Sequence, residues 1–340
     1  MTRPRAVLSM NPPRLARSLF DENALARLHR AADIDTDLVL TELDSARSRD
    51  ALAGVDILVA GWNAPVVRVA HLPFTARLRA VIYAGGVAAT CLEDPAAFAA
   101  RGVVAANARV ANSRPVAEYA LAMILLAGKR VLPAGRAYRR TRTPPDNFAV
   151  PEGFGNYRQT VGIVGASAVG RTVLDLLRPF DLDVLLYDPT LAPEEAAGLG
   201  ARPVELDELM RSSQVISLHQ PLTPTTRGQI DAGRLALMRD GATLVNTARG
   251  AVVDQKALTA ELRTGRIDAV LDVTDPEPPA ADSELWTLDN VLLTPHTAGS
   301  MGGELHRIGD AVAGEVERFA AGLPFAHPED LTFSARTRVR

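Results

Sequence analysis

Three side chains that could bind an acid and move a proton follow strand-like segments in the second half of the chain. Arg249 comes after the apolar run in LVNTARGAVVD, Glu277 lies in the proline-rich stretch after IDAVLDV, and His296 follows VLLTP. A guanidinium is planar, always charged and offers paired N–H donors, so Arg249 can hold a carboxylate and polarise the neighbouring carbonyl. His296 can transfer one proton, and Glu277 can orient its imidazole and favour the protonated form. This set suits the interconversion of a 2-oxo acid and a 2-hydroxy acid beside a nicotinamide.

Short aliphatic runs alternate with helix-length segments along most of the chain, which predicts βαβ units and parallel sheets. The predicted strands are VDILVA, LRAVIY, GVVAA, TVGIVG, DVLLYD, QVISLH, ATLVN, IDAVLDV and VLLTPH. Their near-continuous apolar character indicates that helices cover both faces of each sheet. The predicted fold class is therefore α/β. All strands of a parallel sheet end at one edge, so we expect the polar groups that follow them to meet there.

The turn between TVGIV and the next helix has the features of a dinucleotide-binding site. It runs from Gly165 to Gly170, and Ser167 stands where the fingerprint has its second glycine. The free N–H groups and the dipole at the start of that helix favour a pyrophosphate. Asp188 ends the next strand, eighteen positions beyond Gly170, where an acidic residue binds the ribose hydroxyls and repels a 2′-phosphate. The pattern favours NAD, and the alternative is an ordinary strand–turn–helix with a surface aspartate.

Further polar residues follow the later strands. They are His219, Gln220 and Pro221 after QVISL, Thr247 and Ala248 after ATLVN, and Asp272 after IDAVL. We expect His219 to line the cofactor pocket rather than to act as the acid/base, because polar residues at strand ends most often bind. For Arg249 the alternative is a structural salt bridge, since ion-pair networks imitate functional sites.

The composition limits the class of protein. The chain has 340 residues, of which 47% are hydrophobic, and this allows roughly two domains with full cores. The net charge of −3 gives no field that would attract nucleic acid or an anionic membrane. Cys91 is the only cysteine, which excludes an intrachain disulfide, and no apolar run reaches the roughly 18 residues of a membrane span. We expect a soluble cytoplasmic protein without a metal site.

Three segments outside the strands bear on the domain organisation. A helical pattern spans residues 113–129, with Ser113 as its expected N-cap and Pro115 in its first turn, and it is the expected domain boundary. Residues 131–159 are predicted to form a long loop with solvated arginines, which we interpret as a surface or subunit-contact arm. An amphipathic helix at about residues 303–321 precedes a tail, FSARTRVR, that is expected to fray.

Together these motifs resemble the D-isomer-specific 2-hydroxyacid dehydrogenase family, which includes phosphoglycerate dehydrogenase-like enzymes and glyoxylate and hydroxypyruvate reductases. The segments that carry the resemblance are ANS, PVAEYALAMILLAGKR, VGIVGASAVGR, YDP, SLHQPLTPTTRG, LVNTARGAVVD, AVLDVTDPEP and LLTPHTAGS. The resemblance implies two doubly wound parallel-sheet domains and a homodimer. A Rossmann NAD-binding domain, residues 111–300, would be inserted into a discontinuous flavodoxin-like substrate domain, residues 1–110 and 301–340.

Carried over by position, the catalytic residues of the family fall on Arg249, Glu277 and His296. The substrate is expected to contact Gly85, Gly86, Arg249 and His296. The expected cofactor-binding residues are Gly165, Ser167, Ala168, Val169, Gly170, Asp188, His219, Gln220, Pro221, Thr247, Ala248, Arg249, Asp272, His296 and Gly299. Of these, Asp272 is expected near the nicotinamide amide.

The chain departs from the family pattern at two places. Ser167 replaces the middle glycine, which bears on cofactor affinity, and the loop YAGGVAA lacks the usual aspartate. The N–H groups of Gly85 and Gly86 can still bind a carboxylate. The expected function is that of an NAD-dependent oxidoreductase for a small 2-oxo acid and its D-2-hydroxy acid. The alternative is an NAD(H)-sensing, corepressor-like binding protein, because such proteins share the fold and the triad.

Overall fold

The chain forms two compact units in a computed structural model that describes residues 3–144, 146 and 154–334. Unit 1 combines Met1–Asn112 with Ser300–Arg338, and unit 2 comprises Ser113–Gly299. Each unit has its own parallel sheet covered by helices on both faces. The predicted α/β fold with two parallel-sheet domains is confirmed.

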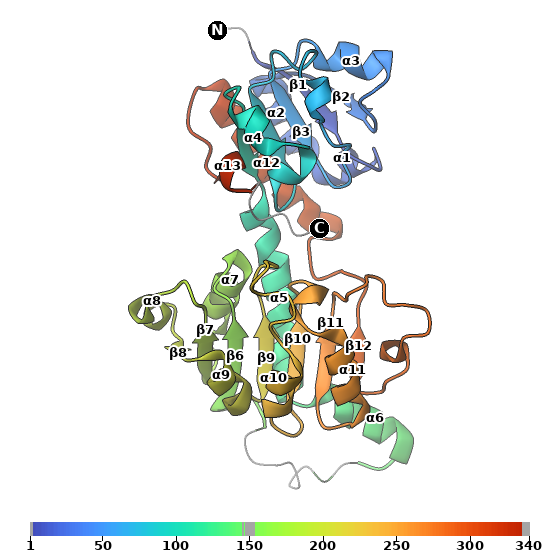
Figure 1. Cartoon of the computed structure of the whole chain (residues 1–340), viewed down its shortest axis with the longest axis vertical. Coiled ribbons are helices and arrows are strands. Elements are labelled where there is room, and N and C mark those ends of the chain that lie inside the picture. Colours follow the sequence, from blue (N-terminus) through green and yellow to red (C-terminus); the bar gives the residue numbers. More distant parts are fainter. Residues whose placement is uncertain (1–2, 145, 147–153, 335–340) are drawn as a thin grey trace. The chain divides into compact units, whose positions relative to one another are not determined.

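Unit 1 is built on a six-stranded sheet in the order β13-β5-β4-β3-β1-β2 (Figure 1). Its strands are β1 (Arg5–Ser9), β2 (Asp33–Leu40), β3 (Ile57–Ala60), β4 (Ala80–Tyr83), β5 (Val104–Asn107) and β13 (Pro328–Glu329). All pairings are parallel except that of β13 with β5. The predicted strands account only for β3, β4 and β5. The other three were missed. β13 has only two residues, β2 alternates acidic with apolar residues, and β1 is an apolar run that was not assigned to a strand.

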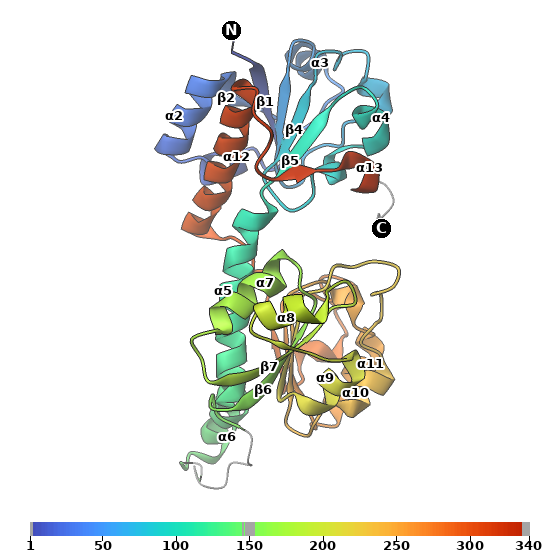
Figure 2. The ribbon, with the colours of Figure 1, turned by 90° about the vertical axis from the view of Figure 1, so that its left-hand side faces the viewer.

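Helices pack on both faces of the unit 1 sheet (Figure 2). They are α1 (Leu15–Leu19), α2 (Glu22–Ala31), α3 (Ala46–Leu52), α4 (Pro95–Ala99), α12 (Leu305–Ala320) and α13 (Leu331–Ser334). The predicted C-terminal helix is α12, and its buried Ile308, Val312 and Val316 share one core cluster with Leu28 of α2. Arg27 of α2 adds ion pairs to α12. Burial of this face makes α12 part of unit 1, and residues 335–340 of the predicted tail lie outside the described residues.

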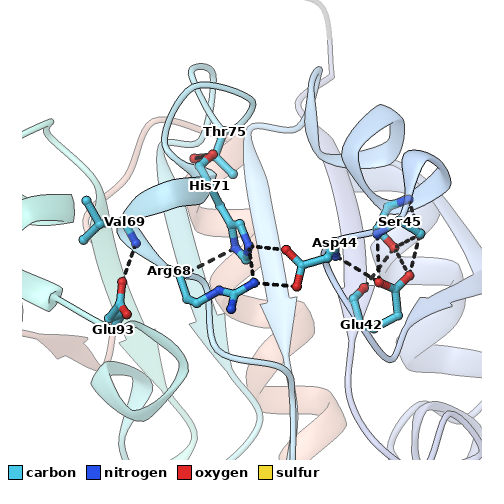
Figure 3. Close-up of polar contacts among 9 residues, drawn as sticks. Glu42, Asp44, Ser45, Arg68, Val69, His71, Thr75 and Glu93 are labelled. Atoms are coloured by element: carbon cyan, nitrogen blue, oxygen red, sulfur yellow. Dashed lines mark hydrogen bonds and ion pairs between the residues drawn. The ribbon is translucent and has the colours of Figure 1, made fainter.

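A buried histidine of unit 1, His71, lies in a cluster of polar contacts that joins its own segment to the segments with Asp44 and Glu93 (Figure 3). His71 is 2% exposed, its Nδ1 accepts from the Arg68 N–H at 3.1 Å, and its Nε2 lies 3.1 Å from Asp44. Because Nδ1 is the acceptor, Nε2 carries the proton and donates it to the carboxylate. The Arg68 guanidinium also pairs with Asp44, and the neighbouring Val69 N–H donates to Glu93. Both ring nitrogens are therefore used within the fold, which makes His71 a structural residue.

Unit 2 contains a seven-stranded parallel sheet in the order β12-β11-β10-β9-β6-β7-β8 (Figure 1). Its strands are β6 (Gln159–Val164), β7 (Leu182–Tyr187), β8 (Arg202–Pro203), β9 (Val215–Leu218), β10 (Thr243–Asn246), β11 (Asp268–Leu271) and β12 (Val291–Leu293). Its helices are α5 (Arg109–Gly128), α6 (Val131–Thr141), α7 (Ala168–Leu177), α8 (Pro193–Gly198), α9 (Leu206–Ser212), α10 (Ala232–Leu237) and α11 (Gln255–Arg263). All predicted strands of this half are present, and only the two-residue β8 was missed.

Two helices of this half differ from the prediction. Helix α5 begins at Arg109, where the Asn107 side chain accepts the Arg109 N–H, and Ser113 is a buried residue inside the helix rather than its N-cap. The predicted loop at residues 131–159 is wrong for its first part, which forms α6. The Arg136 guanidinium is only 26% exposed and pairs with Asp268 at 2.7 Å, so it is not a solvated loop arginine. Residues 145 and 147–153 of the same segment lie outside the described residues.

Among the helices of the described residues, none is both long and apolar enough to cross a lipid bilayer.

Candidate active site

The carboxyl ends of the unit 2 strands lie along one edge of the sheet because every pairing is parallel. The predicted functional residues of this unit follow directly after β6, β7, β9, β10, β11 and β12. Gly85 and Gly86 follow β4 and therefore belong to unit 1. The unit 2 edge thus carries the arginine, the glutamate, the histidine and the predicted nucleotide contacts.

The glycine-rich turn after β6 requires both of its glycines. Gly165 has φ of 95°, and a Cβ added to it would lie 2.6 Å from the Gln220 nitrogen. A Cβ on Gly170 would lie 2.0 Å from the Gly165 oxygen. Ser167 caps α7, since its hydroxyl oxygen accepts from the Gly170 N–H at 3.4 Å and its own proton remains free to be donated. The first turn of α7, with Ala168 and Val169, keeps the N–H groups that favour a phosphate.

Asp188 follows β7 and is held by the glycine-rich turn. One carboxylate oxygen accepts from the Ala166 N–H at 2.7 Å, and the other accepts from the N–H and hydroxyl of Thr190 at 2.9 and 2.6 Å. Burial opposes ionisation of this carboxyl, but the Thr190 and Ala166 hydrogen bonds and the charge of Arg171 outweigh it and lower its pKa. Asp188 is therefore an oriented carboxylate at the expected ribose position.

Three buried polar atoms at the ends of β9 and β10 have no hydrogen-bond partner within the described residues. They are His219 Nδ1, Gln220 Oε1 and Thr247 Oγ1. A buried polar group without a partner costs about 1–3 kcal/mol, so such groups commonly mark a place where a ligand or water completes the bonding. Together with the close approach at Gly165 and the free end of α7, they fit a dinucleotide at this edge. Pro221 follows them in the same segment.

Acidic pH is expected to destabilise the protein through His219. Its imidazole is fully buried, with Nε2 against Ser217 Oγ at 2.9 Å, and burial lowers its pKa to about 3, against roughly 6.5 for an unperturbed histidine. Between these values the unfolded chain binds a proton that the folded chain does not. The contribution of His219 to the free energy of unfolding is therefore complete above about pH 6.5 and falls by about 1.4 kcal/mol per pH unit toward pH 3.

Urea unfolding between about pH 7 and about pH 4 measures this dependence. The His219→Gln variant, which cannot titrate, should show a shallower loss of stability on acidification than the parent protein. Equal slopes for the two proteins would show that His219 binds a proton in the folded state as readily as in the unfolded chain.

The acid/base candidate and its carboxylate partner meet at this edge. His296 Nδ1 lies 2.6 Å from Glu277 Oε1, and the two side chains are 51% and 42% exposed. With Nδ1 held by the carboxylate, Nε2 is the nitrogen left to exchange a proton with a ligand. His296 has φ of 55°, in the left-handed region, so its backbone must be held in place by neighbouring groups.

Asp272 holds the segment that carries His296. Its carboxylate is 2% exposed and accepts from the Thr294 hydroxyl at 2.7 Å, the Thr297 N–H at 2.8 Å and the Ala298 N–H at 3.0 Å. The His296 N–H donates to the backbone oxygens of Asp272 and Thr294. Asp272 was expected beside the nicotinamide, and what the structure shows is this anchoring contact. The segment continues to Gly299, the last residue of unit 2.

Arg249 is exposed at the end of β10 in a turn that the fold defines closely. Asn246 accepts from the Ala248 N–H and donates to the Arg249 oxygen, both at 3.0 Å. Gly250 packs so closely that a Cβ would lie 2.0 Å from the carbonyl of Thr274, which places this turn beside the segment leading to Glu277. Among the described residues no carboxylate lies within 4 Å of the Arg249 guanidinium, so the structural salt bridge is not supported.

In unit 1, the loop with Gly85 and Gly86 is held by an acidic residue that the sequence analysis missed. Glu329 of β13 accepts from the Ala88 and Ala89 N–H groups at 2.7 and 3.0 Å and from the Asn107 side chain at 2.7 Å. A carboxylate from the C-terminal segment thus binds this loop, which has no acidic residue of its own. No sequence signal could reveal it, because 241 positions separate Glu329 from Ala88.

Within the described residues no group of three or more His, Cys, Asp or Glu side chains could hold a metal ion.

Comparisons with known proteins bear on the identity of this site. A family profile described as "D-isomer specific 2-hydroxyacid dehydrogenase, NAD binding domain" matches residues 121–298. The chain is 36% identical over 232 residues to a D-3-phosphoglycerate dehydrogenase of Archaeoglobus fulgidus, covering 68% of this chain and 44% of that protein. It is 35% identical over 224 residues to a glyoxylate reductase of Korarchaeum cryptofilum, covering 65% of this chain and 68% of that protein.

A solved structure covers nearly the whole chain. It is a D-isomer specific 2-hydroxyacid dehydrogenase from Xanthobacter autotrophicus Py2 in complex with NADPH and MES, with 26% sequence identity, a TM-score of 0.73 and coverage of 98% of this chain and 99% of that chain. The chain spans less than half the length of the phosphoglycerate dehydrogenase that it matches. The family profile nevertheless covers more than half of the chain and lies within unit 2. The chain therefore belongs to the D-isomer-specific 2-hydroxyacid dehydrogenase family, and unit 2 is its NAD-binding domain.

Proposed function

We propose that this protein is an NAD-dependent oxidoreductase that interconverts a small 2-oxo acid and its D-2-hydroxy acid. The observation that carries the proposal is the 2.6 Å contact between Glu277 and His296 at the strand edge of the NAD-binding domain. It gives an oriented acid/base whose Nε2 is available to a ligand. The exposed Arg249, without a carboxylate partner in the described part of the chain, supplies the cation that a 2-oxo acid needs.

Each residue of the triad has a distinct task in this proposal. Arg249 binds the carboxylate of the acid through its paired N–H groups and polarises the adjacent carbonyl. Protonated His296 donates from Nε2 to the oxygen that becomes the hydroxyl, and neutral His296 accepts that proton in the reverse direction. Glu277 holds Nδ1–H, which orients the ring. The sequence also suggested the Gly85 N–H for the substrate, but this group already donates to the Tyr83 oxygen at 2.8 Å.

The nucleotide would be held by the residues that line the unit 2 edge. They are Gly165, Ser167, Ala168, Val169, Gly170, Asp188, His219, Gln220, Pro221, Thr247, Ala248, Arg249, Asp272, His296 and Gly299. When bound, the nicotinamide supplies or takes up the hydride.

Replacing Asp188 with alanine should narrow the preference for NADH over NADPH. The carboxylate is fixed by Ala166 and Thr190, so in the native protein it faces the ribose as an anion and repels a 2′-phosphate. The solved relative was crystallised with NADPH, so the choice of cofactor is a property to be measured for this chain. The measurement is the ratio of kcat/KM for the two cofactors with one 2-oxo acid.

Asp183→Ala is a matched control, because it removes a carboxylate from the exposed side of β7. The control should leave the ratio unchanged. If Asp188→Ala also leaves it unchanged, Asp188 does not select the cofactor.

We further propose that the protein is a homodimer, which the family resemblance supports. We also propose that it is cytoplasmic, which the single, buried cysteine supports. Sedimentation of the purified protein would test the dimer.

A panel of 2-oxo acids tests the proposed activity. NADH consumption is followed with glyoxylate, hydroxypyruvate, pyruvate, and longer and aromatic 2-oxo acids, and at least one should be reduced to a D-2-hydroxy acid. Tight NADH binding without turnover of any acid would instead favour an NAD(H) sensor. The named relatives are a dehydrogenase and a reductase, so they give no support to that alternative.

A further inference from the structure

A tyrosine of α5 contacts the segment that carries His296. The Tyr119 hydroxyl lies 2.8 Å from Thr294 Oγ1, and Thr294 Oγ1 in turn donates to Asp272 Oδ1 at 2.7 Å. A threonine hydroxyl has a single proton, and here it is used toward the carboxylate. Tyr119 must therefore be the donor to Thr294, which makes a directed chain from Tyr119 through Thr294 to Asp272.

This series of hydrogen bonds ends at the groups that fix the backbone of His296. Asp272 accepts from the N–H groups of Thr297 and Ala298, which follow His296, while Thr294 precedes it. The His296 N–H is bound between the Asp272 and Thr294 oxygens. The left-handed backbone of His296 is thus held from both sides, and the ring can keep its contact with Glu277.

Tyr119 is suited to remain a donor at all physiological pH values. Burial, with a smaller contribution from the Asp272 charge, raises the pKa of its phenol despite the hydrogen bond to Thr294. The Tyr119 side chain is partly buried against a core cluster of unit 2, which restricts the position of the hydroxyl.

We propose that Tyr119 is a positioning residue for His296, acting through Thr294 and Asp272. The inference rests on the proposed function for its effect on turnover, and it adds a residue outside the triad. It predicts that loss of one hydroxyl, far from the glycine-rich turn in sequence, reduces turnover while leaving nucleotide binding intact.

The test compares Tyr119→Phe with the parent protein in two independent measurements. With a 2-oxo acid that the parent protein reduces, the kcat of Tyr119→Phe should be about tenfold lower. Small misplacements of a catalytic group cost one to two orders of magnitude in rate. The Kd for NADH, measured by fluorescence, should stay within about twofold, and so should KM for the acid. Hydrogen exchange in a peptide spanning residues 291–301 should become faster, which reports on the segment without any turnover.

Variants of Thr294 and a distant tyrosine provide the controls. Thr294→Val should reproduce the loss, Thr294→Ser should retain activity, and the double variant Tyr119→Phe/Thr294→Val should be no worse than either single change. Tyr138→Phe, on an exposed ring of α6, should have no effect. A lower melting temperature with unchanged kcat would show a merely structural role and overturn the proposal.

Failure of the proposed function gives a different result from failure of this inference. If the parent protein turns over no 2-oxo acid, that function fails, and hydrogen exchange alone decides the inference. Unchanged exchange in Tyr119→Phe then overturns it, and faster exchange confined to this segment supports it.

Discussion

Replacing His296 with asparagine is expected to lower turnover by about 10²- to 10⁴-fold, the usual contribution of a positioned acid/base. The His296 imidazole is the proton-transfer group of the proposed site, and its Nε2 is left available by the contact of Nδ1 with Glu277. Asparagine tolerates the left-handed backbone at φ of 55° better than alanine does. The variant therefore removes the proton transfer while retaining the local backbone.

Steady-state assays and NADH binding together check this expectation. His306→Asn is the matched control, because this histidine is exposed on α12 in unit 1, and it should leave turnover unchanged. His296→Asn should still bind NADH, since the cofactor is proposed to be held mainly by other strand ends. Turnover within a few-fold of the parent protein would remove His296 as the acid/base.

The strand-end residues of unit 2 could be predicted because local sequence and tertiary structure agree there. β6, β9 and β10 are covered on both faces, so each appears as an apolar run followed by a polar group. In a parallel sheet the ends of such runs must share an edge. That argument led from residue types to Glu277 and His296, which the structure places 2.6 Å apart.

Other features depend on contacts that no local pattern contains. Glu329 binds the Ala88 and Ala89 N–H groups across more than two hundred residues. Tyr119 lies within an ordinary helical pattern, and its partner Thr294 is 175 positions away. Local signals also compete, since Ser113 has the features of an N-cap but Asn107 accepts the N–H at the actual start of α5. Sequence reasoning therefore named the candidate reacting groups and Glu277, but not Tyr119 or Glu329, whose contacts are distant in sequence.

Asp272 shows that one residue can be expected to contact the cofactor and also position the acid/base. Its expected place is beside the nicotinamide, yet its carboxylate already accepts three hydrogen bonds from the segment carrying His296. A carboxylate has about four acceptor sites, so one contact remains available to a ligand. Loss of Asp272 would therefore disturb the acid/base and the cofactor together, and such a variant would not separate the two roles.

Replacing Arg249 with glutamine is expected to lower kcat/KM for the 2-oxo acid by about 10³-fold. The change removes charge-assisted hydrogen bonds to the carboxylate, worth about 1.5–3 kcal/mol in binding. It also removes the cation that stabilises charge developing on the carbonyl oxygen, whose loss lowers kcat as well as raising KM. Lysine restores the charge but not the planar fork, so Arg249→Lys should lie between the parent protein and Arg249→Gln.

Activity on the 2-oxo acid and the Kd for NADH, measured separately in the Arg249 variants, test whether Arg249 binds the acid. Arg249→Gln should keep the Kd for NADH within a few-fold, because Asn246 and Gly250 define the turn through backbone contacts that the change leaves in place. The change removes one bond of the turn, from the Arg249 guanidinium to the Ala248 oxygen at 2.6 Å. Arg202→Gln, an exposed arginine paired with Glu208, is the control and should have no effect. If Arg249→Gln and Arg249→Lys lose equal activity, the planar fork is required. If neither variant loses activity, Arg249 does not bind the acid, and the carboxylate must be held by other groups.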